Sequence, residues 1–66
     1  MEKLANNLRQ MRKKQRYTQQ QMADFVGVHR TTYTRYESGE VEPSLDILCN
    51  IADMFGCTTD ALLGRE

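Results

Sequence analysis

The segment Arg30–Ser38 carries side chains whose types and spacing suit the binding of nucleic acid in this chain of 66 residues. Because a helix turns by about 100° per residue, a helix here would place Arg30, Thr31, Thr34 and Arg35 on one side. An arginine can donate two parallel hydrogen bonds to guanine, at roughly 1–3 kcal/mol of discrimination per good pair, and a threonine methyl can pack against thymine. This side is therefore a candidate surface for reading base edges.

The other side of the same segment has a different character. It carries Thr32, Tyr33, Tyr36 and Glu37. A helix divided in this way buries its aromatic side and displays the polar one. Thr32 faces sideways, so it can reach a phosphate as readily as a base. The Tyr33 ring can fill a core, but its hydroxyl needs a partner or solvent, which could bring it to the edge that faces DNA.

A second predicted helix precedes this segment and is joined to it by a glycine turn. Thr18 and Gln21 have the spacing of a capping box, in which each side chain satisfies a backbone N–H of the other residue. Gly27 is expected to end the helix of residues 18–26 in the left-handed conformation. His29 then holds the cap position of the next helix, where serine or threonine would cap better.

Three further helices are predicted from apolar spacing. Residues 2–14, 45–55 and 59–63 place apolar side chains at helical intervals. The apolar face of the second of these segments is expected to begin at Leu45. No strand pattern appears in the sequence. The expected fold class is all-α, with five helices in a single domain that spans residues 1–66.

Charge is unevenly distributed although the formal net charge is zero. Residues 1–16 hold six basic side chains and one acidic one, a net charge of +5, whereas residues 37–66 carry −6. A basic half would attract phosphates and an acidic half would repel them, although ordinary solvated helix faces would give the same counts. The basic run Arg12–Arg16 either suits the negative end of the first helix dipole or forms a phosphate clamp.

Several classes of function lack their usual residues. Cys49 and Cys57 lie eight positions apart, which is not a spacing of metal ligands, and we expect buried, reduced thiols. No nucleophile–histidine arrangement and no phosphate-cradling glycine loop occurs, so neither an enzyme nor a cofactor is expected. No apolar run could span a bilayer, and the N-terminus lacks a secretory apolar region. A cytoplasmic protein without a membrane partner is expected.

Longer motifs extend through most of the chain. Counted from Gln19, Ala23 holds the fifth place and Gly27 the ninth of a helix-turn-helix core. The chain also contains LRQMR, TQQQMADFVGV, ESG and EPSLDILCNIADMFGCTTDALL. Over residues 4–63 it resembles the Cro/lambda-repressor-type helix-turn-helix proteins, the XRE family. The resemblance implies a compact five-helix, lambda-repressor-like bundle in which helices 2 and 3 form the helix-turn-helix.

The resemblance also implies roles for residues of the third helix. By this resemblance the helix lies in the major groove, where Arg30 and Thr31 face base edges. Arg35, about one helical turn further along, also faces the bases. Thr34 completes the set of candidates for base contact. For Arg30 the alternative is a surface ion pair with Glu37, seven residues on.

A second set of residues is expected at the DNA backbone. The candidates for phosphate contact are Gln19, His29, Thr32 and Ser38. The first of these can also brace the third helix. A protonated His29 would strengthen binding at low pH, and a solvated turn residue is the alternative. By resemblance, Arg12 pairs with Glu37 in a structural salt bridge.

These features predict a sequence-specific, double-stranded DNA-binding transcriptional regulator, a repressor, that reads the major groove with residues 30–38. A domain of this size makes a small contact, so a homodimer on a palindromic operator is expected, with half-sites about 34 Å apart. The alternative is a protein-interaction module or an antitoxin, in which DNA binding is secondary and the acidic half of the chain meets a basic protein partner.

Overall fold

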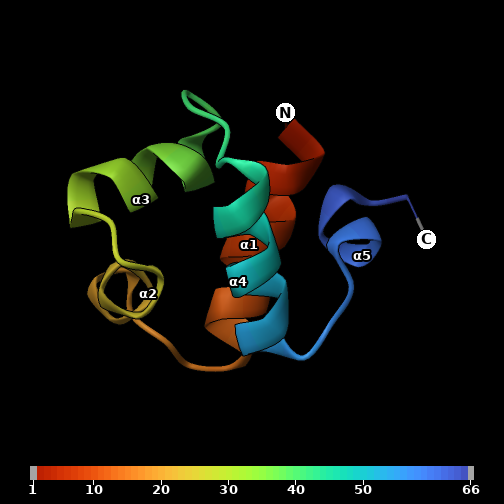
Figure 1. Ribbon diagram of the computed structural model, residues 1–66, viewed down its shortest axis with the longest axis horizontal. Helices are drawn as coiled ribbons and strands as arrows, with labels where there is room; N and C mark the ends of the chain where they lie inside the picture. The colour runs from red at the N-terminus through yellow and green to blue at the C-terminus, as the bar shows by residue number, and fades with distance from the viewer. Residues whose placement is uncertain (1, 66) are drawn as a thin grey trace.

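The computed structural model describes residues 2–65, which fold into five α-helices without a strand (Figure 1). The helices are α1 (Glu2–Lys14), α2 (Gln19–Val26), α3 (Arg30–Ser38), α4 (Leu45–Phe55) and α5 (Thr59–Leu63). Helix α1 packs against both α3 and α5, and α2 packs against α3. The expected all-α, five-helix fold is confirmed.

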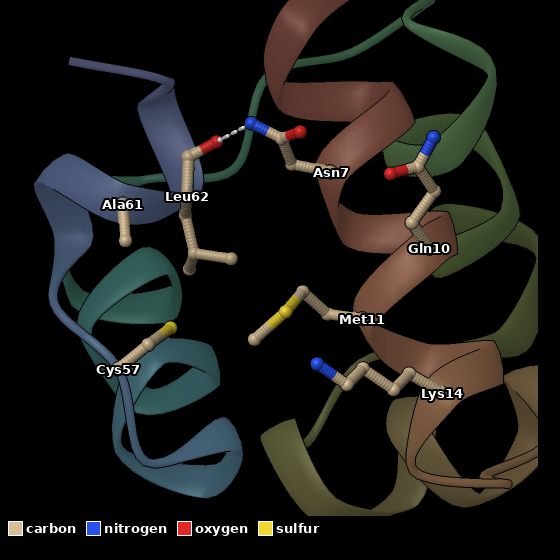
Figure 2. A pocket seen from close by; sticks show the side chains of 7 residues that line it. All are labelled: Asn7, Gln10, Met11, Lys14, Cys57, Ala61 and Leu62. Atoms are coloured by element: carbon tan, nitrogen blue, oxygen red, sulfur yellow. Dashed lines mark hydrogen bonds between the residues drawn. The ribbon is translucent and has the colours of Figure 1, made fainter. Parts of the chain in front are cut away.

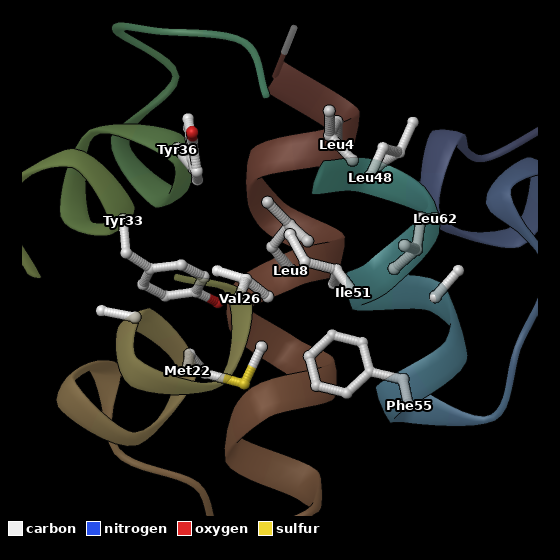
Figure 3. Packing of buried hydrophobic residues seen from close by; sticks show 12 residues of the cluster. Leu4, Leu8, Met22, Val26, Tyr33, Tyr36, Leu48, Ile51, Phe55 and Leu62 are labelled. Atoms are coloured by element: carbon white, nitrogen blue, oxygen red, sulfur yellow. The ribbon is translucent and has the colours of Figure 1, made fainter. Parts of the chain in front are cut away.

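One hydrophobic core holds all five helices together. Each helix supplies one of the five largest fully buried side chains, which are Leu8, Met22, Tyr33, Ile51 and Leu62. Figure 3 shows these side chains gathered in the space between the helices. Burying a large apolar side chain stabilises a fold by about 1.5–3 kcal/mol. Because the core is shared, each helix is fixed by contacts with several others.

Local capping sets the helix boundaries. At the start of α2, Thr18 Oγ1 accepts a hydrogen bond from the Gln21 N–H at 3.0 Å, and Gln21 Oε1 accepts one from the Thr18 N–H at 2.9 Å. Ser44 and Thr58 cap α4 and α5 through their hydroxyl oxygens. These bonds satisfy backbone donors that a helix start leaves without partners. The observed boundaries agree with the predicted ones except at the start of α2, which begins at Gln19 because Thr18 is its cap.

The apolar face of α4 begins later than the sequence suggests. Leu45 was expected in the core, but it is 72% exposed, and the buried stripe starts at Leu48. Leu45 is the first residue of the helix, so its side chain lies at the end of α4 beyond the shared core. Spacing alone does not show where along its length a helix meets its neighbours.

The two cysteines differ in their surroundings. Cys49 is exposed, and Cys57 is half-buried against the core. Cys49 lies three residues after Asp46 and four before Asp53, and both acids are exposed, so all three share the outer face of α4. The expectation of two buried thiols is therefore wrong for Cys49.

Tyr33 is fully buried and does not reach the surface. Its ring lies in the core and meets the ring of Tyr36 edge-on, with centroids 6.1 Å apart. Its hydroxyl is near the Glu37 carboxylate but makes no well-formed hydrogen bond within residues 2–65. Burial, together with the neighbouring Glu37 charge, raises the pKa of this hydroxyl. The expectation that the hydroxyl reaches the DNA edge is wrong, because the ring is drawn into the core.

We expect Tyr33→Phe to keep the free energy of unfolding unchanged or to raise it by up to about 1 kcal/mol, because deleting a buried hydroxyl without a good partner removes a desolvation cost. Tyr33→Ala should instead cost about 3–5 kcal/mol through the cavity it leaves. Urea unfolding at pH 7 measures both. A marked loss in the phenylalanine variant would show that the hydroxyl and Glu37 share a stabilising hydrogen bond.

Candidate nucleic-acid interface

The turn between α2 and α3 is set by backbone hydrogen bonds from its first two residues. Gly27 adopts the left-handed conformation with φ 79°, and its N–H donates to the Ala23 carbonyl at 2.9 Å. The Val28 N–H donates to the same carbonyl at 3.0 Å, and the Val28 side chain packs against the core. A residue with a Cβ would be strained at Gly27. The turn therefore fixes how α3 leaves α2.

The exposed side of α3 is the side on which the candidates for base contact lie. Arg30, Thr31, Thr34 and Arg35 are all exposed. The opposite side, with Tyr33 among its members, is buried. The helix thus displays a small, polar and basic surface.

Two of these exposed residues, Arg30 and Arg35, have few competing partners. Arg30 makes no ion pair within residues 2–65, whereas the Nε of Arg35 lies 3.9 Å from the Glu40 carboxylate. Both Arg35 and Glu40 are more than half exposed, and such pairs contribute little to stability. Both guanidinium groups can therefore turn to a ligand at small cost.

Three of the four candidates for phosphate contact lie around the ends of α3, and Gln19 lies at the start of α2. His29 is exposed and Thr32 is half-buried. Ser38 donates from its hydroxyl to the Arg35 carbonyl at 3.1 Å. His29 has the extended backbone of a cap residue, yet its side chain makes no capping hydrogen bond. Among α2 to α5, α3 is the one helix without a side-chain cap.

Gln19 links the start of α2 to the middle of α3. Its Nε2 donates to Glu37 Oε1 at 3.2 Å. The Thr34 hydroxyl lies 3.0 Å from Gln19 Oε1 and 2.9 Å from the Arg30 carbonyl, and its single proton is shared between these two acceptors. The Thr34 hydroxyl is therefore engaged within the protein. Its methyl remains the part available to a ligand.

A buried ion pair joins α1 to α3 beneath this surface. Arg12 donates from Nε to Glu37 Oε2 at 2.6 Å and from Nη2 to Glu37 Oε1 at 3.1 Å. Its Nη1 donates to the Tyr17 carbonyl at 3.0 Å. The side chains are only 12% and 3% exposed. Because Glu37 faces Arg12, the surface pair between Glu37 and Arg30 does not form.

This pairing controls the ionisation of both side chains. Burial by itself would raise the pKa of Glu37, but hydrogen bonds from Arg12 and Gln19 outweigh it and hold that pKa below its ordinary value. The hydrogen bond to Glu37 raises the pKa of Arg12 in turn, against the opposing effect of burial. The pair is therefore fully charged at neutral pH.

Two features of this site could not be predicted from the spacing of residues in the sequence. The hydrogen bond between Gln19 and Thr34 joins residues 15 positions apart on different helices. The basic run at the end of α1 is split, since Arg12 turns inward while Lys13 and Lys14 stay exposed. Residues 2–65 contain no helix able to cross a membrane and no group of three side chains placed to hold a metal ion.

Comparison with known proteins agrees with this geometry. A family model described as helix-turn-helix matches residues 8–62, which includes all of α2 and α3. The chain belongs to this helix-turn-helix family. The resemblance to the Cro/lambda-repressor-type, or XRE, proteins is thereby confirmed. No solved structure matches the chain at a significant level.

Curated relatives of the family align with nearly the whole chain. The chain is 46% identical to the HTH-type transcriptional regulator AnsR of Bacillus subtilis over 92% of its own length and 53% of that protein. It is 44% identical to the cryptic phage CTXphi transcriptional repressor RstR of Vibrio cholerae, over 97% of the chain and 54% of that protein. An HTH-type transcriptional activator of Enterococcus faecalis, BcrR, is 37% identical over 89% of the chain and 29% of that protein. The chain spans about half the length of the first two.

We expect Glu37→Gln to lower the free energy of unfolding at pH 7 by about 3 kcal/mol, because it leaves the Arg12 charge buried without a counter-charge. The folded-state pKa of Glu37 is depressed, so its contribution is present above the ordinary glutamate value of 4.5 and is lost as pH falls through the folded value. The stability gap between wild type and variant should therefore shrink from pH 5 to pH 3.

Denaturant unfolding across this pH range measures the gap. The matched control is Glu40→Gln, which removes an exposed carboxylate three residues further along the chain and should leave stability nearly unchanged. Equal stability of wild type and Glu37→Gln at pH 7 would contradict the structural role of the pair.

Proposed function

We propose that this domain is a sequence-specific, double-stranded DNA-binding transcriptional regulator that places α3 in the major groove. The observation that carries the proposal is the exposed face of α3, which presents Arg30 and Arg35 on a helix held by a buried ion pair and by the turn at Gly27. Membership of the helix-turn-helix family, and the printed names of its relatives as transcriptional regulators, support it.

The proposed reading of bases follows from the direction of α3. Arg30 and Thr31 lie in its first turn, and Arg35 lies at about one turn further on. In a major groove about 12 Å wide the two arginines can each pair with a guanine through O6 and N7. The methyl groups of Thr31 and Thr34 can pack against thymine.

The proposed contacts to the DNA backbone flank the reading surface. His29 and Thr32 lie at the first turn of α3, Ser38 lies at its last turn, and Gln19 starts α2. An uncapped helix start is a local departure from good helix design, and such departures occur at functional sites. The missing cap at His29 supports a role for its imidazole at a phosphate.

We also propose that the protein acts as a homodimer and as a repressor on a palindromic operator. The domain measures 28 × 22 × 21 Å, so two copies fit on one face of DNA at half-sites about 34 Å apart. The repressor RstR aligns with 97% of the chain, which favours repression over the activation named for BcrR.

The central test is selection of bound sequences from random double-stranded DNA, followed by the variant Arg30→Ala/Arg35→Ala. We expect an enriched palindrome with half-sites one helical turn apart. Each lost guanine pair should cost about 1–3 kcal/mol, so the double variant should lose affinity by at least about thirtyfold. Circular dichroism should show an unchanged fold, because both arginines are exposed.

Lys3→Ala is the control, since Lys3 is an exposed cation that lies beside Gly64 at the α5 end of the domain. Its affinity for the selected DNA should match that of wild type. Binding that persists in the arginine variant would overturn the proposed reading surface. Selection of no sequence at all would favour the protein-interaction or antitoxin alternative.

A second prediction concerns His29→Ser. Serine supplies the missing cap, so the free energy of unfolding should rise by about 0.5–1 kcal/mol. If the protonated imidazole contacts a phosphate, wild type should bind the selected DNA more tightly at pH 6 than at pH 8, and the serine variant should lose this dependence. Fluorescence anisotropy at the two pH values measures it. A wild-type affinity that does not change between pH 6 and pH 8 would remove the contact by a protonated imidazole.

A further inference from the structure

A cleft with a volume of about 370 Å³ opens between α1 and α3. Its lining includes the buried pair Arg12 and Glu37 together with the side chain of Gln19. These three are joined by hydrogen bonds and leave no net charge, because the guanidinium and the carboxylate cancel. The base of the cleft is thus rigid and neutral.

The rest of the lining carries an excess of positive charge. Arg9 and Lys13 lie four residues apart on α1, so both face the same side of the helix, and both are exposed. Arg9 donates from Nη2 to the neutral Asn6 side chain at 2.6 Å. Neither cation makes an ion pair within the described part of the chain. No acid other than Glu37 lines the cleft, so two positive charges are uncompensated.

The cleft lies beside the proposed DNA-binding surface, so its positive charge faces the DNA backbone. Three residues of its lining, Gln19, Thr34 and Ser38, belong to the surface that we propose meets DNA. An α-helix is about 10–12 Å across, and the major groove is about 12 Å wide. If α3 fills the major groove, the helices packed beside it cannot enter the groove. Their side chains next to α3 instead meet the phosphates at the edge of the groove.

We infer that this cleft binds a backbone phosphate of the DNA on the α1 side of the recognition helix, with Arg9 and Lys13 as its cations. The inference rests on the proposed function. Arginine can grip a phosphate through two N–H groups, and lysine acts as a point charge. Ser38 lines the α3 side of the cleft, but its hydroxyl already donates to the Arg35 carbonyl, so the two cations carry the site.

The neighbouring lysine provides a matched control within the same helix. Lys14 lies instead beside a pocket between α1 and α5, with Met11 and Cys57, as Figure 2 shows. Lys13 and Lys14 are both exposed and both lie in the last turn of α1. Their effects on net charge and on the helix dipole are therefore the same, and only the direction of the side chain differs.

The experiment compares Lys13→Gln with Lys14→Gln on the selected operator between 50 and 200 mM salt. We expect Lys13→Gln to weaken binding several-fold and to reduce the slope of log K against log salt by about 1, while Lys14→Gln changes neither. Arg9→Gln/Lys13→Gln should reduce the slope by about 2. The loss should be equal on operator and random DNA, because a phosphate carries no sequence information.

The outcomes separate this site from the proposed function. Equal losses in the two lysine variants would mean that only overall charge matters, and would overturn the site. Unchanged binding in Lys13→Gln, together with lost binding in Arg30→Ala/Arg35→Ala, would overturn the site and leave the function in place. A wild-type protein that selects no DNA sequence would overturn the function and the site with it. Equal melting temperatures of the two lysine variants establish that folding is not the cause.

Discussion

The buried ion pair between Arg12 and Glu37 is the constraint on which the arrangement of α3 depends. It ties α1 to α3, reaches the Tyr17 carbonyl before α2, and takes a further hydrogen bond from Gln19. A buried pair is weak evidence for stability, because desolvation of the two charges offsets much of their attraction. Its stronger effect is geometric, since a bidentate pair fixes distance and direction together. Here it sets the rotation of α3 about its own axis.

The rotation of α3 about its axis matters because its aromatic side must be buried and its polar, basic side must stay exposed. A helix of nine residues is too short to be stable alone in water, and α3 also lacks a side-chain cap. Its order must come from packing of Tyr33 and Tyr36 in the core. A small rotation would bury a polar residue and expose an aromatic one. The core and the ion pair together hold the basic face of α3 toward solvent before a ligand arrives, which limits the entropy lost when the ligand binds.

The tertiary fold decides which surface each charged side chain reaches. The basic residues of the first half divide among three directions: one is buried in the pair, two face the cleft beside α3, and the others lie elsewhere on the surface. The acids Asp46 and Asp53 occupy the outer face of α4. When positive charge is confined to one side of a protein, its field orients an approaching polyanion before contact. A zero net charge is thus compatible with the binding of DNA.

The sequence by itself determined the helices and the face of α3, because both depend on local interactions. Hydroxyl caps and glycines act within a few residues, and the division of α3 follows from its own periodicity. Only the tertiary structure decided what lies around that face. It left Leu45 and Cys49 exposed, buried the Tyr33 hydroxyl, and turned Lys13 toward the cleft and Lys14 away from it. These outcomes depend on where neighbouring helices end and cross, which no spacing within a single helix encodes.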